Sequence, residues 1–271
     1  MRIRSALTCA LVLCLTAIPV VASAKQCGND ASGFTAWLAA FRREAVASGI
    51  SPAVVNAALG DAYYAKATIR LDRNQGSMKL SYEEFLKKRG AAAIIQKGRR
   101  LKAQNAALFA SIEGKFGVPA GPLLAIWGME TAFGGFAGKQ KLFPAIATLA
   151  YDCRRSVLFE EQLYAALKIV QSGQLTVEQM KGAGHGEIGQ MQFLPVNYLK
   201  YGVDGDGDGR VDMISSRADA LASTANYLRG YGWQPGFGYQ PGEPNFEAIA
   251  GWNKSQVYQR AIAYVGREID G

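Results

Sequence analysis

The sequence predicts an all-α protein, because apolar residues recur at helical spacing along the chain while strand signals are scarce. Proline and glycine residues separate the helical stretches where helices are expected to begin and end. The only modest strand candidate is the segment 63–71, and the central segment 181–216 is rich in loop residues. No internal repeat interrupts this pattern.

The N-terminal segment predicts export. Arg2 and Arg4 precede an uncharged apolar run over residues 6–21, and Ala22-Ser23-Ala24 supplies the small residues of a cleavage site. The run is too short for a membrane span, which needs roughly 20 apolar residues. We therefore expect residues 1–24 to be a signal peptide and the mature chain to be periplasmic. Cys14 lacks the small residues that precede a lipidated cysteine, which disfavours a lipoprotein anchor.

The mature chain divides into helices, each with apolar residues at helical spacing or a recognisable start signal. Ser51-Pro52 and Pro119 are two such starts. The expected helices cover residues 37–46, 52–59, 91–116, 119–131, 144–151, 156–171, 219–229 and 253–267. We group residues 25–90 as a small N-terminal helical lobe and residues 91–271 as the main core.

Two of the four cysteines, Cys9 and Cys14, leave with the signal peptide. Cys27 and Cys153 remain, and in an oxidising compartment we expect them to form a disulfide. Closing so long a loop contributes about 2–4 kcal/mol to stability. The alternative is two unconnected thiols.

Glu130 lies on an apolar helix face. Leu123, Ile126 and Trp127 stand seven, four and three residues before it and project from the same side. Desolvation there would raise the pKa of the Glu130 carboxyl and favour its protonated form, as a general acid requires. The alternative is a helix-terminal glutamate that reaches water or accepts backbone hydrogen bonds.

Other catalytic designs find little support. The chain has a single histidine, His185, in a glycine-rich loop, so a zinc site built on histidines is not expected. A Ser-His-Asp triad is not supported, because no Gly-x-Ser-x-Gly turn accompanies His185. A Cys–His pair would use a cysteine that we expect to be oxidised.

The segment 203–212 (VDGDGDGRVD) resembles a calcium loop that begins at Asp204. Counted from that residue, aspartates occupy positions one, three, five and nine of the loop, and a glycine occupies position six. Position twelve falls on Ser215 and not on the usual bidentate glutamate. We expect a weak, structural Ca²⁺ site; a hydrogen-bonded acidic turn is the alternative. The candidate ligands and the neighbouring cation are Asp204, Asp206, Asp208, Asp212 and Arg210.

Several short blocks follow one another along the mature chain: Gly117-Val118-Pro119, GMETAFG (128–134), GQMQFLP (189–195), the acidic segment 203–212, ANYL (225–228) with Gly232-Trp233, and Trp252-Asn253-x-Ser255-x-x-Tyr258. In these blocks and in their order, over nearly all of its mature length, the chain resembles the lytic murein transglycosylase B family.

The resemblance implies a lysozyme-like catalytic domain in which Glu130 is the sole acid/base. It also implies a lyase that cuts peptidoglycan between N-acetylmuramic acid and N-acetylglucosamine without water and needs no cofactor for the chemistry. Glu130 would first protonate the leaving oxygen and then accept the C6 hydroxyl proton, which closes a 1,6-anhydro ring. The substrate's N-acetyl group would replace the second carboxylate of ordinary glycosidases.

The resemblance further implies sugar contacts by Gln192, Trp252, Asn253 and Tyr258, although ordinary core packing is an alternative for the two aromatic residues. Three departures affect the site. The family's Gly-Ala-Met-Gly stretch contains Glu187 here, which either enters the groove and raises the pKa of Glu130 or points to solvent. A serine that the family usually has shortly before this stretch is replaced by Ala183 or Gly184. In the N-terminal lobe, Phe85 stands where the family usually has an aromatic residue with a hydroxyl.

The formal charge is +8 for the whole chain and +6 without Arg2 and Arg4, which favours an anionic partner. Peptidoglycan peptides and membrane surfaces are both anionic, so we expect glycan strands as substrate and allow a peripheral contact with the membrane or cell-wall machinery. The densest basic cluster, residues 97–102, lies on a predicted helix, so no nucleic-acid partner is expected. We expect a monomer.

Two competing hypotheses use the same residues. A lysozyme-type muramidase would keep Glu130 but let water complete the reaction. A murein-binding scaffold would keep the fold without turnover, with the altered Glu187 loop as a sign of lost activity.

Overall fold

The computed structural model describes residues 26–74 and 80–271. The predicted signal peptide, residues 1–24, lies outside this range. The described residues form thirteen helices and one two-stranded antiparallel sheet, which confirms the all-α prediction. No helix in this part of the chain is both long and apolar enough to cross a bilayer.

The described residues form the following helices and strands in chain order. They are α1 (Phe34–Ala47), α2 (Pro52–Leu59), α3 (Lys66–Arg73), α4 (Tyr82–Arg89), α5 (Ala91–Gln104), α6 (Ala106–Phe116), α7 (Ala120–Thr131), β1 (Gln140–Lys141), α8 (Leu142–Tyr151), α9 (Ser156–Gln171), β2 (Lys181–Gly182), α10 (Pro195–Tyr201), α11 (Arg217–Gly230), α12 (Phe246–Trp252) and α13 (Gln256–Asp270).

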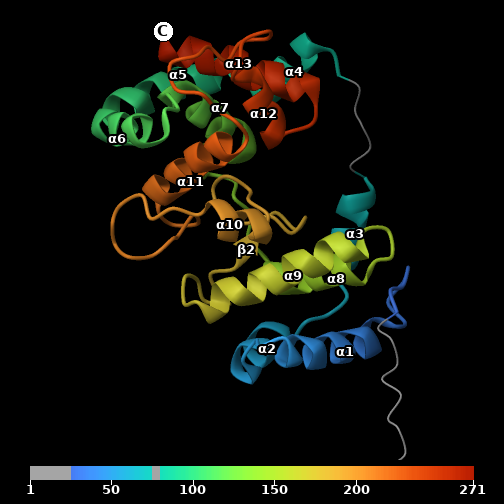
Figure 1. The fold of residues 1–271 in the computed structure, drawn as a ribbon. Helices are drawn as coiled ribbons and strands as arrows, with labels where there is room; N and C mark the ends of the chain where they lie inside the picture. The colour runs from blue at the N-terminus through green and yellow to red at the C-terminus, as the bar shows by residue number, and fades with distance from the viewer. Residues whose placement is uncertain (1–25, 75–79) are drawn as a thin grey trace, which may run out of the picture.

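Two groups of helices occupy opposite ends of the molecule (Figure 1). At one end α1, α2 and α3 pack against α8 and α9, and at the other α5 and α13 pack against α7 while α4 packs against α13 and α5. Helices α10 and α11 lie between the two groups. The segment 25–90, which the sequence groups as one lobe, is therefore divided between both ends, because α4 packs against α13.

Local chemistry explains the start of α2 and one error of prediction. The Ser51 hydroxyl accepts a hydrogen bond from the Val54 amide at 3.3 Å and caps α2, as expected for a serine before a helix. The predicted helix over 91–116 is in fact α5 and α6, which are separated at Asn105, whose side chain donates to the Leu101 carbonyl at 2.8 Å.

The strand suggested over 63–71 was wrong. Most of that segment belongs to α3, which buries Thr68, Ile69 and Asp72 along one side. Asp72 lies four residues after Thr68 and three after Ile69, so the helical period outweighs the weak strand signal. The helix expected over 253–267 begins later, at Gln256, because α12 ends at Trp252 and Asn253 adopts an extended conformation.

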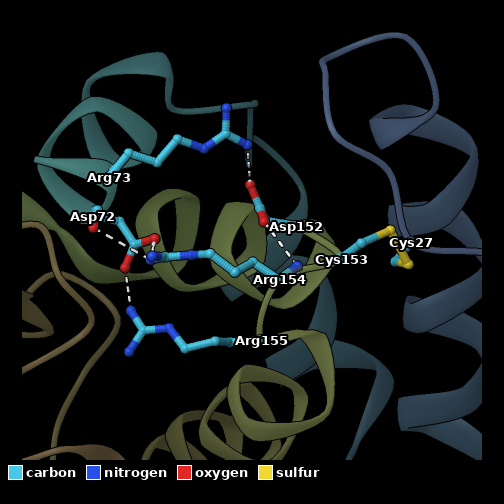
Figure 2. A network of polar contacts seen from close by, with 7 residues as sticks. All are labelled: Cys27, Asp72, Arg73, Asp152, Cys153, Arg154 and Arg155. Atoms are coloured by element: carbon cyan, nitrogen blue, oxygen red, sulfur yellow. Dashed lines mark hydrogen bonds and ion pairs between the residues drawn. A yellow bond between two sulfur atoms is a disulfide. The ribbon is translucent and has the colours of Figure 1, made fainter.

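A covalent and ionic junction ties the N-terminal segment to the turn between α8 and α9 (Figure 2). The predicted disulfide between Cys27 and Cys153 is present and joins residues 126 positions apart. Backbone hydrogen bonds flank it, from the Gly28 amide to the Tyr151 carbonyl at 3.0 Å and from the Cys153 amide to the Gly28 carbonyl at 3.2 Å.

Arginines hold α3 to the same turn. The buried carboxylate of Asp72 forms ion pairs with both Arg154 and Arg155 (Figure 2). In the opposite direction, Arg73 reaches from α3 to the buried carboxylate of Asp152 at 2.8 Å. Helix α3 and the turn thus each supply an acid and a base to the ion pairs that hold them together.

Candidate active site

Glu130 occupies the last turn of α7 and is the one residue of that helix that is not fully buried. Ala132 and Phe133 follow with φ of 49° and 62°, in the left-handed region that non-glycine residues seldom adopt. The chain therefore turns away directly after the glutamate. The Thr131 hydroxyl donates to the Gln190 carbonyl at 2.6 Å and anchors the second loop of the site to the helix end.

Two neutral donors hold the Glu130 carboxyl. The Trp252 indole Nε1 at the end of α12 donates to Glu130 Oε1 at 3.0 Å, and the Tyr258 hydroxyl of α13 donates to the same oxygen at 2.6 Å. Within the part of the chain that the structure describes, no hydrogen bond to Oε2 and no ion pair to this carboxyl is formed. Oε2 is thus the oxygen left to exchange a proton with a ligand.

Tyr258 is buried, and residues of α4 pack against its ring. Burial, and next the charge of Glu130, raises the pKa of its hydroxyl well above the usual range, so the group remains a neutral donor. The Phe85 ring of α4 packs edge-on against Tyr258 with centroids 5.6 Å apart. The Arg89 guanidinium lies over both rings and donates to the Met129 carbonyl at 3.2 Å.

A cavity of about 220 Å³ opens beside Glu130. It is lined by Glu130, Glu187, Gln192, Phe193, Leu194, Asn197, Tyr227, Trp252 and Asn253. Five of these residues are sequence-predicted site residues, now brought together from α7, the 181–195 loop and the end of α12. Two other predicted residues, Tyr258 and Phe85, are not among the lining residues; they form successive layers behind Glu130.

Four lining residues were not predicted as site residues. Phe193 and Leu194 belong to the GQMQFLP block and Tyr227 belongs to the ANYL block, so both motifs carried a usable signal. Asn197 follows in the first turn of α10, and only the fold brings it to the cavity.

A tight turn presents Gln192 to the cavity. Ile188 and Phe193 exchange both backbone hydrogen bonds, at 2.8 and 3.0 Å, and close the turn. Gln192 adopts a φ of 54° within it, and its Nε2 donates to the carbonyls of Ala137 and Gly189 at 3.2 and 2.9 Å. Strained backbone of this kind often marks a functional position. With its nitrogen committed, the amide oxygen is the part of the side chain left to face a ligand.

Glu187, for which the sequence left two placements open, is among the residues that line the cavity. Burial, with a smaller contribution from the charge of Glu130, raises the pKa of its carboxyl to about 7, against the lowering effects of a hydrogen bond from its own backbone amide and of the charge of Arg155. His185 is not a lining residue, and burial followed by the charge of Arg155 lowers its pKa.

The acidic loop differs from the predicted ligand set. Carboxylate oxygens of Asp204, Asp206 and Asp219 lie within 4.8 Å of one another, whereas Asp208 and Asp212 do not join them. The Asp208 carboxylate accepts from the Arg210 amide at 2.8 Å, and Asp212 accepts the amides of the two residues that follow Met213. Asp219 was missed because it lies beyond the loop, in the first turn of α11.

The chain is similar in sequence to known lytic transglycosylases. The family model described as Transglycosylase SLT domain matches residues 33–242. The membrane-bound lytic murein transglycosylase B of Escherichia coli (strain K12) is 35% identical over 138 residues, which are 48% of this chain and 38% of that protein. The match thus spans little more than a third of that relative.

Solved structures share the fold. SltB3 from Pseudomonas aeruginosa, in complex with NAG-anhNAM-pentapeptide, matches with a TM-score of 0.82 and 28% identity, covering 88% of this chain and 80% of SltB3. The Escherichia coli lytic transglycosylase Slt35, in complex with calcium, matches with a TM-score of 0.76 and 24% identity over 91% and 96% of the two chains. Both agree with the lysozyme-like fold that the sequence predicts.

Proposed function

Since the chain belongs to the transglycosylase SLT domain family, we propose that it is a lytic transglycosylase that cleaves peptidoglycan glycan strands between N-acetylmuramic acid and N-acetylglucosamine. The observation that supports this function best is the state of Glu130. Its carboxyl lines a polar cavity, and two neutral donors fix one of its oxygens while the other is left for a ligand.

In the first step Glu130 acts as the acid. Because Trp252 and Tyr258 both donate to Oε1, the proton is carried on Oε2 and passes from there to the glycosidic oxygen. The C–O bond to the leaving sugar breaks, and the N-acetyl group of the muramic acid stabilises the cation that forms at the anomeric carbon. No second nucleophilic carboxylate is needed for this substrate-assisted route.

In the second step the ionised Glu130 acts as the base. It takes the proton of the muramic acid C6 hydroxyl, whose oxygen bonds to the anomeric carbon and closes the 1,6-anhydro ring. Oε1 accepts hydrogen bonds in both protonation states, so the contacts with Trp252 and Tyr258 persist through the cycle. The geometry of the acid is therefore kept for its use as a base.

The cavity lining suits a sugar. Amide groups of Gln192, Asn197 and Asn253 match hydroxyl and acetamido groups, and the rings of Tyr227 and Trp252 offer faces for sugar C–H surfaces. The bound NAG-anhNAM-pentapeptide of SltB3 contains the anhydro sugar that this reaction would form. Export would bring the chain to its substrate, and the Cys27–Cys153 disulfide suits an oxidising compartment.

The deciding experiment is mass analysis of purified sacculi digested by the mature chain. Anhydromuramic ends are expected; reducing ends that have gained a water would instead identify a muramidase. Glu130→Gln should lower turnover by at least about 10³-fold, while the exposed Glu113→Gln should not. Wild-type protein that binds sacculi and releases no fragments would identify a scaffold.

We also propose that Asp204, Asp206 and Asp219 bind a structural Ca²⁺. Three carboxylates within 4.8 Å provide the oxygen donors that this ion prefers. The loop adjoins the active site, because Gln190 donates from its amide to the Met213 carbonyl at 3.0 Å and from its side chain to the Ile214 carbonyl at 3.1 Å. Calcium should raise the Tm of wild type but not that of Asp206→Asn, and an unchanged wild-type Tm would refute the site.

A further inference from the structure

The cavity beside Glu130 is small for the substrate proposed above. Its volume of about 220 Å³ lies below the roughly 300–1,000 Å³ of pockets that enclose a drug-sized ligand. A glycan strand is a chain of many sugars, so it must leave the cavity and continue over the protein surface. A surface that holds these further sugars should therefore adjoin the cavity lining.

Exposed aromatic rings are the candidates for such a surface, because a flat ring can cover the apolar C–H face of a sugar. Within the described residues, the exposed aromatic side chains are those of Tyr63, Phe136, Tyr231 and Phe237. Tyr231 is the one of these four whose ring contacts a ring of the cavity lining. It stacks on Tyr227, with centroids 4.6 Å apart and an angle of 22° between the ring planes.

Aromatic rings form a continuous series from the Glu130 carboxyl to the surface. The Trp252 indole donates to this carboxyl at 3.0 Å. Tyr227 packs edge-on against Trp252, with centroids 5.0 Å apart, and carries Tyr231 on its face. Tyr227 is 6% exposed, whereas Tyr231 is 44% exposed. The lining of the cavity thus continues outward onto the Tyr231 ring.

The backbone of α12 fixes the position of the Tyr231 ring. A Cβ atom at Gly251 would lie 2.2 Å from Cδ1 of Tyr231, so the ring rests directly on the residue that precedes Trp252. The Gly251 carbonyl also accepts a hydrogen bond from the Tyr227 hydroxyl at 2.9 Å. The Tyr231 amide donates to the carbonyls of Tyr227 and Leu228, both at 3.1 Å. Tyr231 is therefore held in place while nearly half of its surface stays open to solvent.

Tyr201 of α10 belongs to the same aromatic cluster but is closed to a ligand. Its ring lies 4.7 Å from that of Tyr227 and 6.1 Å from that of Tyr231, and it is only 6% exposed. The Lys200 ammonium lies over the ring, 4.9 Å from the centroid. A Cβ atom at Gly230 would lie 2.5 Å from Tyr201, so the end of α11 covers the ring as well. Tyr231 is thus the open ring of this cluster.

We propose that Tyr231 is a glycan-binding residue that forms an outer sugar subsite and continues the cavity beyond Tyr227. This inference rests on the proposed function and deepens it, because the chain would hold its strand by sugars beyond those at the cleaved bond. The apolar C–H face of a sugar packs on the Tyr231 ring, and the sugar hydroxyls remain in water. Since the contact is with sugar, glycan strands without stem peptides should also use it.

The first test measures binding without cleavage, in a Glu130→Gln background. The probes are a disaccharide and a hexasaccharide of peptide-free glycan, and calorimetry gives the Kd of each. The hexasaccharide should bind more tightly than the disaccharide. Adding Tyr231→Ala should reduce this gain in affinity about fivefold, and Tyr231→Phe, which keeps the ring, should preserve it. Tyr63→Ala removes a tyrosine that is 62% exposed and precedes α3; it is the matched control and should leave the gain unchanged.

Three outcomes would overturn the proposal. If Tyr231→Ala keeps the full gain in affinity with length, the ring does not contact the glycan. If the variant weakens both oligomers equally, Tyr231 only supports Tyr227 in the cavity. If the chain with Tyr231 intact binds the disaccharide and the hexasaccharide equally well, no outer subsite exists.

A second test distinguishes this subsite from the proposed function. NMR of the chain with labelled tyrosines should show that the Tyr231 ring signals shift with the hexasaccharide and not with the disaccharide. A chain that shows this shift, yet releases no anhydromuramic ends from sacculi, would refute the proposed function and leave the subsite in place. Cleavage of sacculi by a chain whose Tyr231 signals do not move would refute the subsite alone.

Discussion

Two carboxylates of this chain, Glu130 in the cavity and Asp72 in the junction with the disulfide, are held by opposite kinds of partner. Asp72 forms ion pairs with the guanidinium groups of Arg154 and Arg155 (Figure 2). Glu130 instead receives hydrogen bonds from an indole and a phenol, which carry no charge. Both groups sit at contacts between helices that are far apart in the sequence.

The difference separates a structural acid from a reactive one. A carboxylate between two arginines gains from its charge, so it stays ionised and its contacts depend on that charge. A carboxyl held through one oxygen by neutral donors can gain or lose a proton on the other oxygen without breaking those contacts. We therefore expect changes in the junction to alter stability and changes around Glu130 to alter turnover.

The largest effect on stability should come from the disulfide of the junction. Replacing Cys27 and Cys153 with serine opens a loop whose ends are 126 residues apart. The free energy of unfolding, measured by urea denaturation, should fall by about 3–4 kcal/mol, and kcat should stay within about twofold. Reduced wild type is the matched control. A large loss of kcat in the folded variant would mean that the junction acts on the cavity and would break the comparison.

Asp72→Asn should have the next largest effect. The Asp72 side chain is 4% exposed and those of Arg154 and Arg155 are 47% and 38% exposed, so the arginines regain water when their partner is lost. We expect a loss of about 2–3 kcal/mol, below the range for fully buried pairs, with turnover nearly kept.

The same measurements on Glu130→Gln give the reverse pattern. Stability should change by less than about 1 kcal/mol because the amide fills the same volume, while turnover falls by at least about 10³-fold. Equal stability losses in the two variants would contradict the distinction between the two acids.

The sequence predicted the parts of the fold that depend on local chemistry. Pro119 and the Ser51 cap marked helix starts correctly, and the Cys27–Cys153 pair followed from the loss of the other two cysteines. It failed where tertiary contacts decide. The strand suggested at 63–71 is largely helical because α3 buries one side against α8, and that neighbour cannot be read from the segment itself.

In the candidate site, too, the sequence predicted what depends on local pattern and missed what depends on tertiary contacts. Glu130 was predicted as the acid from an apolar helical stripe and a family resemblance, but its hydrogen bonds to Trp252 and Tyr258 join residues 122 and 128 positions apart. Spacing along one helix cannot predict such contacts. The placement of Glu187 also stayed open until the packing of β2 on its backbone was known, and Asp219 lay outside the loop pattern that predicted its neighbours.

The smallest effect should follow from removing one donor to Glu130. Tyr258→Phe keeps the ring against Phe85 but deletes the 2.6 Å hydrogen bond to Oε1, while Trp252 still donates to the same oxygen. We expect kcat to fall about tenfold, the equivalent of roughly 1.4 kcal/mol, with little change in KM because the hydroxyl does not line the cavity. Tyr264→Phe, on the same helix, is the matched control and should leave kcat unchanged. A rise in KM without a change in kcat would make Tyr258 a sugar contact and would remove it from the support of the acid.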